Sequence, residues 1–135
     1  MKDIFPYIKS QCHSQQFDVN ALLDELQISD TYLREISRKH FGLSPSELIE
    51  SVRLDTILSS IENHEHFVIM SQRCGFGSIK TFNRAFSKRV GISAAQARRQ
   101  LINSEDKEAL REQWREKIWS LGGRGIPSSS QKVNI

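Results

Sequence analysis

Apolar residues between Leu48 and Ile61 recur three or four positions apart, which is the spacing of one face of an α-helix. The sequence SPSE at residues 44–47 comes just before them, and it combines a capping box with a proline at the first helical position. Together these features predict a long helix over residues 45–61. Helical spacing dominates elsewhere too, and no alternation of apolar and polar residues predicts a β-strand. The predicted fold is therefore all-α.

Capping residues predict where the other helices begin and end. Asp18, Ser29 and Ser78 belong to the residue types preferred at helix N-caps. Ser93 begins a second capping box just after Gly91, a residue suited to end the preceding helix in a left-handed conformation. The seven helices predicted in the first 101 residues cover about residues 3–13, 19–26, 30–41, 45–61, 66–74, 79–89 and from 94 onward.

A further helix is predicted over residues 104–120. Its apolar stripe, at positions i, i+4, i+8 and i+11, consists of Leu110, Trp114, Ile118 and Leu121. Such a stripe is most often a packing face for the body of the chain, and the alternative is a surface for a partner. Residues 122–135 are rich in glycine, serine and proline, which predicts a disordered tail.

Two pairs of short helices flank the long one. Residues 18–42 and residues 66–90 both have the order helix, short turn, helix, which is the layout of a helix-turn-helix. In the second pair, Gly75 gives the turn its backbone freedom, and Phe76 is expected to plug the corner between the helices. The predicted architecture is two helix-turn-helix units joined by a long linker helix, with an accessory helix at residues 104–121.

The helix that begins after Ser78 has two different faces. Phe82, Ala85 and Phe86 share one face and are expected to pack. The opposite face carries Lys80, Asn83, Arg84, Ser87 and Lys88. Arginine and asparagine are suited to base edges and lysine to phosphates, and the helix start at Ser78 offers backbone N–H groups to a phosphate.

Charge is unevenly distributed along the chain, although the net charge is only +3. Residues 67–101 contain seven basic and no acidic residues, whereas residues 1–66 contain six basic and eleven acidic ones. A charge run is often only a solvated face, but such a face usually mixes both signs. An acid-free segment of this length favours a polyanionic partner.

Residues 74–93 carry a pattern of turn glycine, serine cap, phenylalanine and basic residues, and two other stretches support it. The three stretches are CGFGSIKTFNRAFSKRVGIS at residues 74–93, ISDTYLREI at 28–36 and FGLSPSELIESVRL at 41–54. These stretches resemble the DNA-binding domain of the AraC/XylS family of bacterial transcription regulators. The resemblance extends over about residues 4–101. It implies a homeodomain-like DNA-binding domain at residues 1–103, whose two recognition helices enter successive major grooves of double-stranded DNA.

The resemblance also implies which side chains contact DNA. On the second recognition helix these are Ile79, Lys80, Asn83, Arg84 and Lys88, next to the helix start at Ser78. On the first recognition helix they are Thr31, Arg34, Glu35 and Arg38. RNA polymerase is a candidate second partner of such a regulator.

The first unit departs from the family pattern at several positions. Gln27 stands where a turn glycine is common, and Ser37 stands where the family mostly has phenylalanine. Phe41, one turn later, is expected to refill the space left by Ser37. Glu35 stands where arginine is frequent. Its carboxylate could accept from a cytosine amine, repel phosphate, or pair with a basic neighbour on the same helix.

Other kinds of site have little support in the sequence. Cys12 and Cys74 are the only cysteines and lie far apart, so reduced thiols are expected rather than a disulfide framework or a zinc site. The segment His64-Glu65-His66 has no third ligand cluster nearby, and a loop is the favoured interpretation. No catalytic motif, membrane span or secretion signal is apparent. We therefore expect a cytoplasmic protein that is not an enzyme and has no cofactor, metal or effector site.

Two functions fit these features. The first is a sequence-specific DNA-binding transcription regulator that reads two successive major grooves. The second is a helical interaction protein that binds RNA polymerase or another regulator without specific DNA binding, because the first half of the chain is acidic. Binding to a specific duplex in competition with random DNA separates the two.

Overall fold

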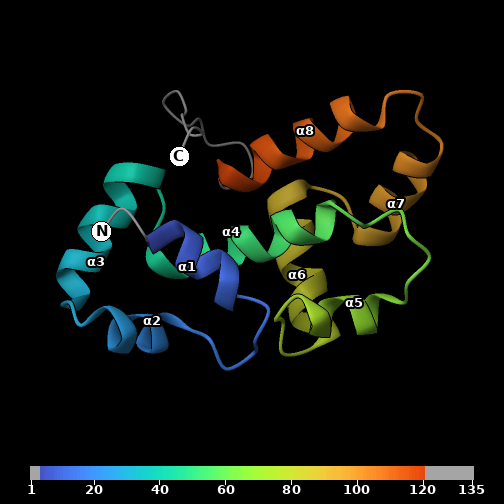
Figure 1. Cartoon of the computed structure of the whole chain (residues 1–135). Coiled ribbons are helices and arrows are strands. Elements are labelled where there is room, and N and C mark those ends of the chain that lie inside the picture. The colour runs from blue at the N-terminus through green and yellow to red at the C-terminus, as the bar shows by residue number, and fades with distance from the viewer. Residues whose placement is uncertain (1–3, 121–135) are drawn as a thin grey trace.

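The computed structural model describes residues 4–120, and within this range the chain forms eight α-helices and no β-strand. The elements are α1 (Ile4–Gln11), α2 (Val19–Leu26), α3 (Asp30–Phe41), α4 (Pro45–Leu58), α5 (Phe67–Arg73), α6 (Ile79–Val90), α7 (Ala94–Ile102) and α8 (Lys107–Trp119). Figure 1 shows α1–α3 and α5–α7 as two groups on either side of α4. The predicted all-helical architecture is confirmed. The predicted tail at residues 122–135 lies outside the described residues.

Side-chain caps fix most helix starts. The side chains of Asp18, Ser29 and Ser78 each accept a hydrogen bond from a backbone N–H of the first helical turn. Capping boxes begin α4 at Ser44 and α7 at Ser93. These local bonds satisfy N–H groups that have no partner inside the helix. Because the caps are local, the sequence predicted these five starts correctly.

Two helix boundaries differ from the prediction by about three residues, and the others by less. Helix α4 ends at Leu58 instead of residue 61, because the chain continues in turns at residues 59–62. Helix α8 begins at Lys107 instead of residue 104. Its start is set by Asp106, whose carboxylate accepts from the N–H of Ala109.

Helix α4 is shared by two hydrophobic cores. Up to residue 52, the residues of α4 that pack with α1–α3 are Leu48, Ile49 and Val52. In its second half, the residues that pack with α5–α8 are Leu54, Ile57 and Leu58. Burying each such side chain stabilises the fold by about 1.5–3 kcal/mol. The two helix-turn-helix units are therefore parts of one folded body.

Helix α8 packs onto this body. Trp114 is 4% exposed and Ile118 is fully buried in the core of the second unit, so the stripe is a packing face, as the first of the two interpretations predicted. Arg111 is also buried, and it donates to a main-chain carbonyl of α4 and to Glu62. The last residue of the stripe, Leu121, lies outside the described residues.

The turn of the second unit lies directly against the first unit. Gly75 has φ +95°, and a Cβ atom added there would lie 2.0 Å from the carbonyl oxygen of Cys12. The Arg53 guanidinium of α4 donates to that carbonyl and to those of Ser14 and Phe17. Glycine is required at residue 75 both by its backbone angle and by this close approach.

Replacing Gly75 with alanine is expected to destabilise the fold, because the methyl group would require a left-handed backbone and a shift of the adjacent main chain. Strain of this kind costs on the order of 1–3 kcal/mol. Gly77, in the same turn, is the matched control, since the space around it is open and its φ is not left-handed. Chemical unfolding should show a clear loss for Gly75→Ala and a change of at most about 1 kcal/mol for Gly77→Ala. Equal stability of the two variants would contradict this account of the turn.

Candidate nucleic-acid interface

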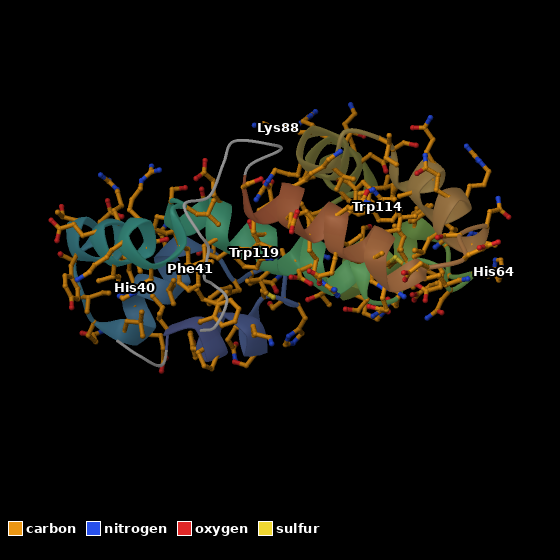
Figure 2. All side chains as sticks on the ribbon, turned by 90° about the horizontal axis from the view of Figure 1, so that it is seen from above. His40, Phe41, His64, Lys88, Trp114 and Trp119 are labelled. Atoms are coloured by element: carbon orange, nitrogen blue, oxygen red, sulfur yellow. The ribbon has the colours of Figure 1, made fainter. Side chains whose placement is uncertain are left out.

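The outer face of α6 carries the polar side chains predicted for the second recognition helix. Phe82, Ala85 and Phe86 are buried on the inner face. There the Phe82 ring lies 5.5 Å from the ring of Phe76, which plugs the corner of the turn as predicted. The exposed residues are Ser78, Lys80, Thr81, Asn83, Arg84, Ser87 and Lys88, with Ile79 half-buried beside them. Figure 2 shows Lys88 at the upper edge of the molecule.

The cap of α6 uses the Ser78 side chain. Its hydroxyl oxygen accepts from the N–H of Thr81 at 3.1 Å, and its O–H donates to the Thr81 hydroxyl at 3.0 Å. Ser78 therefore holds the first turn of this helix through its side chain.

Helix α3 presents the first predicted set of contact residues. Leu33 and Ser37 are buried on its inner face. The four predicted contact residues, Thr31, Arg34, Glu35 and Arg38, are all exposed, as are Tyr32, Lys39 and His40. Arg34 forms an ion pair with Asp30, one turn earlier, whereas Glu35 forms no ion pair with any residue between 4 and 120. The proposed pairing of Glu35 with a basic neighbour is absent, and its carboxylate faces solvent.

Gln27 takes over the role of the usual turn glycine. Its backbone is left-handed, with φ +57°, a conformation that is uncommon for residues other than glycine. Its side-chain amide donates to the carbonyl of Asp24 at 2.6 Å. This local bond accompanies the departure from the family pattern at the end of α2.

The buried hydroxyl of Ser37 has a hydrogen-bond partner. It donates to the carbonyl of Leu43 at 2.7 Å. Phe41, which was expected to refill the space beside Ser37, has its aromatic contacts elsewhere. Its ring lies 5.5 Å from that of Phe5 and 6.4 Å from that of Trp119. Phe41 therefore joins the end of α3 to α1 and α8.

One of the seven basic residues in the acid-free segment points inward. Arg89 is 2% exposed. Its guanidinium donates to Glu50 and Ser51 of α4 and to the carbonyl of Ile118 in α8. This side chain fastens α6 to α4 and α8.

Arg73 and Arg98 are also engaged within the fold. Arg73 binds the Glu65 carboxylate at 2.5 Å. Arg98 lies over the Phe67 ring at 3.9 Å and donates to the carbonyls of Ile61 and Glu65, both at 2.7 Å. The segment's exposed cations without an ion pair inside residues 4–120 are Lys80, Arg84, Lys88 and Arg99. Four of the seven basic residues in 67–101 are therefore exposed without an ion pair inside residues 4–120, and three of these four lie on α6.

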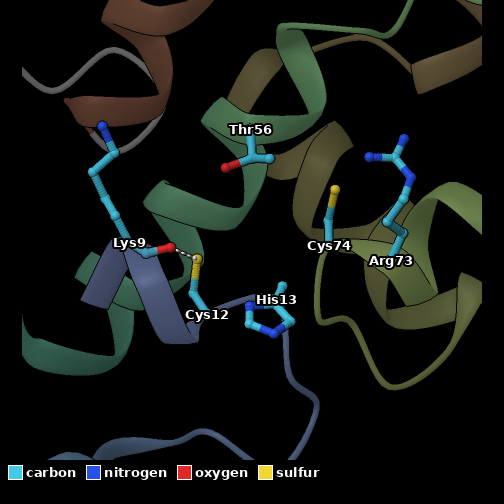
Figure 3. Close-up of a pocket in the computed structure, with 6 residues that line it drawn as sticks. All are labelled: Lys9, Cys12, His13, Thr56, Arg73 and Cys74. Atoms are coloured by element: carbon cyan, nitrogen blue, oxygen red, sulfur yellow. Dashed lines mark hydrogen bonds between the residues drawn. The ribbon is translucent and has the colours of Figure 1, made fainter. Parts of the chain in front are cut away.

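The two cysteines line one cavity, which sequence spacing did not indicate. Figure 3 shows this cavity between the end of α1, helix α4 and the turn after α5. Its volume is about 340 Å³, and its lining residues are Lys9, Cys12, His13, Thr56, Arg73 and Cys74. Burial raises the pKa of both thiols, which disfavours the reactive thiolate form.

Residues 4–120 contain neither a metal-ligand cluster nor a membrane-spanning helix. In that range no three His, Cys, Asp or Glu side chains gather in a way that could hold a metal ion. No helix in the same range is long and apolar enough to cross a membrane.

The chain is similar in sequence to known regulatory proteins. The sequence model of a family described as "Helix-turn-helix domain" matches residues 22–100. The chain is similar to the HTH-type transcriptional regulator Rv1931c of Mycobacterium tuberculosis, with 29% identity over 82 residues, 60% of this chain and 32% of that protein. It is also similar to the Msm operon regulatory protein of Streptococcus mutans, with 31% identity over 101 residues, 72% of this chain and 36% of that protein.

A longer relative matches over a small part of its length. Histidine kinase P4 of Formosa agariphila is 28% identical over 97 residues, 71% of this chain and 7% of the kinase. The chain thus spans little more than a third, or less, of the length of these curated relatives.

Two solved structures share the fold. One is the C-terminal domain of AraT, a response regulator from Geobacillus stearothermophilus, with TM-score 0.70, 22% identity, and coverage of 77% of this chain and 87% of that one. The other is the C-terminal domain of the two-component response regulator yesN from Fusobacterium nucleatum, with TM-score 0.67, 21% identity, and coverage of 72% and 95%.

Arg89 is buried and its neighbour Lys88 is exposed, which predicts a large loss of stability for Arg89→Ala and almost none for Lys88→Ala. Arg89→Ala leaves the Ser51 hydroxyl and the Ile118 carbonyl without their buried partner, so the free energy of unfolding should fall by up to about 3–5 kcal/mol. Lys88→Ala should change it by less than about 0.5 kcal/mol. Urea unfolding measures both, and an Arg89→Ala protein as stable as the parent would show that the buried contacts contribute little.

Proposed function

Because this chain belongs to the AraC-type helix-turn-helix family, we propose that it binds specific sites in double-stranded DNA and regulates transcription. Helices α3 and α6 read two successive major grooves. The contacts come from Thr31, Arg34, Glu35 and Arg38 of α3 and from Ser78, Ile79, Lys80, Asn83, Arg84 and Lys88 at α6.

The observation that carries this proposal is the outer face of α6. Lys80, Arg84 and Lys88 are exposed there and form no ion pair within residues 4–120. Asn83 lies among them, and aromatic packing fixes the inner face of the same helix. Arginine and asparagine form forked hydrogen bonds to base edges, and lysine binds phosphates as a point charge. A helix whose inner face is fixed by packing and whose outer face is cationic is suited to the major groove.

The linker supports reading by both units. Helix α4 has 14 residues, so it is about 21 Å long at 1.5 Å per residue. In Figure 1, α3 and α6 lie on either side of it. Successive major grooves on one face of a duplex are about 34 Å apart. The length of α4 together with the sideways offset of α3 and α6 is compatible with that span.

The two units contribute unequally in this proposal. On α3, the exposed Glu35 opposes binding to phosphate, and Arg34 shares its charge with Asp30. On α6, no acidic residue is present. The second unit therefore supplies most of the affinity, and the first unit adds sequence reading.

A second candidate function is binding to RNA polymerase or another regulator. It is supported by Val68 and Ile69 of α5, which are 49% and 51% exposed, since exposed apolar neighbours are suited to protein contacts. The decisive comparison is competition with random DNA at physiological salt. A selected duplex that stays bound supports the first function, whereas polymerase binding without any preference among duplexes supports the second.

Arg84→Ala should weaken binding to a specific duplex by about 1–3 kcal/mol if Arg84 makes a forked contact to a base. The duplex is obtained by selecting from a random library with the wild-type chain. The loss on a random duplex should be smaller. Lys88→Ala is the comparison variant, and it should weaken binding to both duplexes alike. Equal losses for Arg84→Ala on the two duplexes would instead make Arg84 a phosphate contact.

Affinity should depend steeply on salt. Four to six phosphate contacts, from the exposed cations of α3, α6 and α7, predict a slope of roughly −4 to −5 for the logarithm of affinity against the logarithm of salt concentration. Fluorescence anisotropy with a labelled duplex between about 50 and 200 mM salt covers the useful range. A nearly flat response would exclude a DNA interface of this size.

Glu35→Ala should raise affinity for random DNA, because it removes a negative charge that faces the phosphates. One unit charge 4 Å from another is worth about 1 kcal/mol in water, so the gain should be at most about fivefold. Glu116→Ala, an exposed carboxylate on α8, is the control and should leave affinity unchanged. Lost specific binding with unchanged random binding would show that Glu35 reads a base.

A further inference from the structure

Helix α8 contacts both recognition helices through two adjacent residues. The carbonyl of Ile118 accepts from Arg89 of α6. The Trp119 ring lies 6.4 Å from that of Phe41, the last residue of α3, and 6.2 Å from that of Phe5 in α1. Figure 2 shows Trp119 and Phe41 next to each other. Trp119 thus borders the cores of both units.

Polar bonds hold this end of α8 on the linker helix. The indole N–H of Trp119 donates to one oxygen of Asp55, and Nε of Arg115 donates to the other, both at 2.8 Å. A carboxylate that binds two donors one turn apart on the same helix fixes both the position and the rotation of that helix. Arg89 adds a cation at the C-terminal end of α8, where the carbonyls carry partial negative charge.

We propose that the last turn of α8, residues 115–119, fixes the distance and rotation between α3 and α6, and so selects the half-site spacing that the chain accepts. Helix α4 joins the two units through the chain itself. The turn at Gly75 also touches the first unit, next to the Cys12 carbonyl. The last turn of α8 adds a further connection, which runs from Arg89 through Ile118 and Trp119 to Phe41. Removing the Trp119 ring breaks this connection at the first unit and leaves Arg89 in place.

Spacing matters because DNA is a helix. One extra base pair between two half-sites moves the second by about 3.4 Å and rotates it by about 34°. A protein with two fixed recognition helices loses one set of contacts after such a shift, whereas a protein with loosely joined units keeps both. The spacing part of this inference, that the chain selects a half-site spacing, rests on the proposed DNA binding. The geometric part, that the last turn of α8 fixes the distance and rotation between α3 and α6, does not.

The geometric part is tested without DNA. Spin labels are attached at Thr31→Cys on α3 and Ser87→Cys on α6, which are both exposed positions. Pulsed electron paramagnetic resonance then measures the distance between the two helices. Cys12 and Cys74 are buried and stay in place. We expect a narrow distance distribution in the parent and a broader one in Trp119→Ala.

Matched variants separate this effect from general loss of stability. Leu110→Ala trims the other end of α8, which packs only partly against the second core, and should keep the parent distribution. Trp119→Phe retains an aromatic ring and should lie between parent and Trp119→Ala. If Trp119→Ala does not fold, Phe41→Leu removes the same ring contact from the α3 side and should broaden the distribution. An unchanged distribution in the folded variant overturns the proposal.

The spacing part uses the duplex selected by the wild-type chain, the same duplex with one or two base pairs inserted between its halves, and an isolated half-site. One inserted base pair should cost the wild type about tenfold or more in affinity, and Trp119→Ala less than about threefold, because fixed units gain from mutual positioning. Half-site affinity should be equal in both proteins. Equal spacing penalties would overturn the proposal. If no duplex is selected at all, the proposed function fails, and the spin-label distances still decide the geometry.

Discussion

Helix α4 is buried along most of its surface, and this burial is the constraint from which the arrangement of the two units follows. Its apolar residues belong to both cores, so neither unit can move far without exposing them to water. Its charged residues are bound to neighbours on different sides: Glu50 to Arg89 of α6, Arg53 to the loop between α1 and α2, and Asp55 to α8. Helix α4 therefore anchors both units, and α8, bound to Asp55, completes the placement of α3 and α6.

The basic residues divide between two tasks in this fold. The planar guanidinium carries five N–H donors, so one buried arginine can satisfy several acceptors at once. Arg53 donates to three main-chain carbonyls of the loop after α1. Arg111 donates to the carbonyl of Leu58 at the end of α4 and to Glu62. Lys80, Arg84 and Lys88 remain exposed on α6. The number of basic residues in the sequence therefore overstates the charge available to a polyanion.

Features that depend on near neighbours could be predicted from the sequence, whereas contacts between distant residues could not. The caps at Ser44 and Ser93 involve residues three positions apart, and the two faces of α6 follow from helical spacing. Arg89 could have been placed inside by the same spacing, since it continues the series of Phe82, Ala85 and Phe86 at i, i+3, i+4 and i+7. Arginine is mostly an exposed residue, so its charge argued against a buried position. The shared cavity of the two cysteines and the contacts of the last turn of α8 arise only when the two units pack together.

Hydroxyl-radical footprinting of the wild-type chain on its selected duplex tests the central claim most directly. Two recognition helices held on one body should protect two segments whose centres lie about 10–10.5 base pairs apart on one face of the DNA. A single protected segment, or weak protection spread evenly along the duplex, would contradict the account.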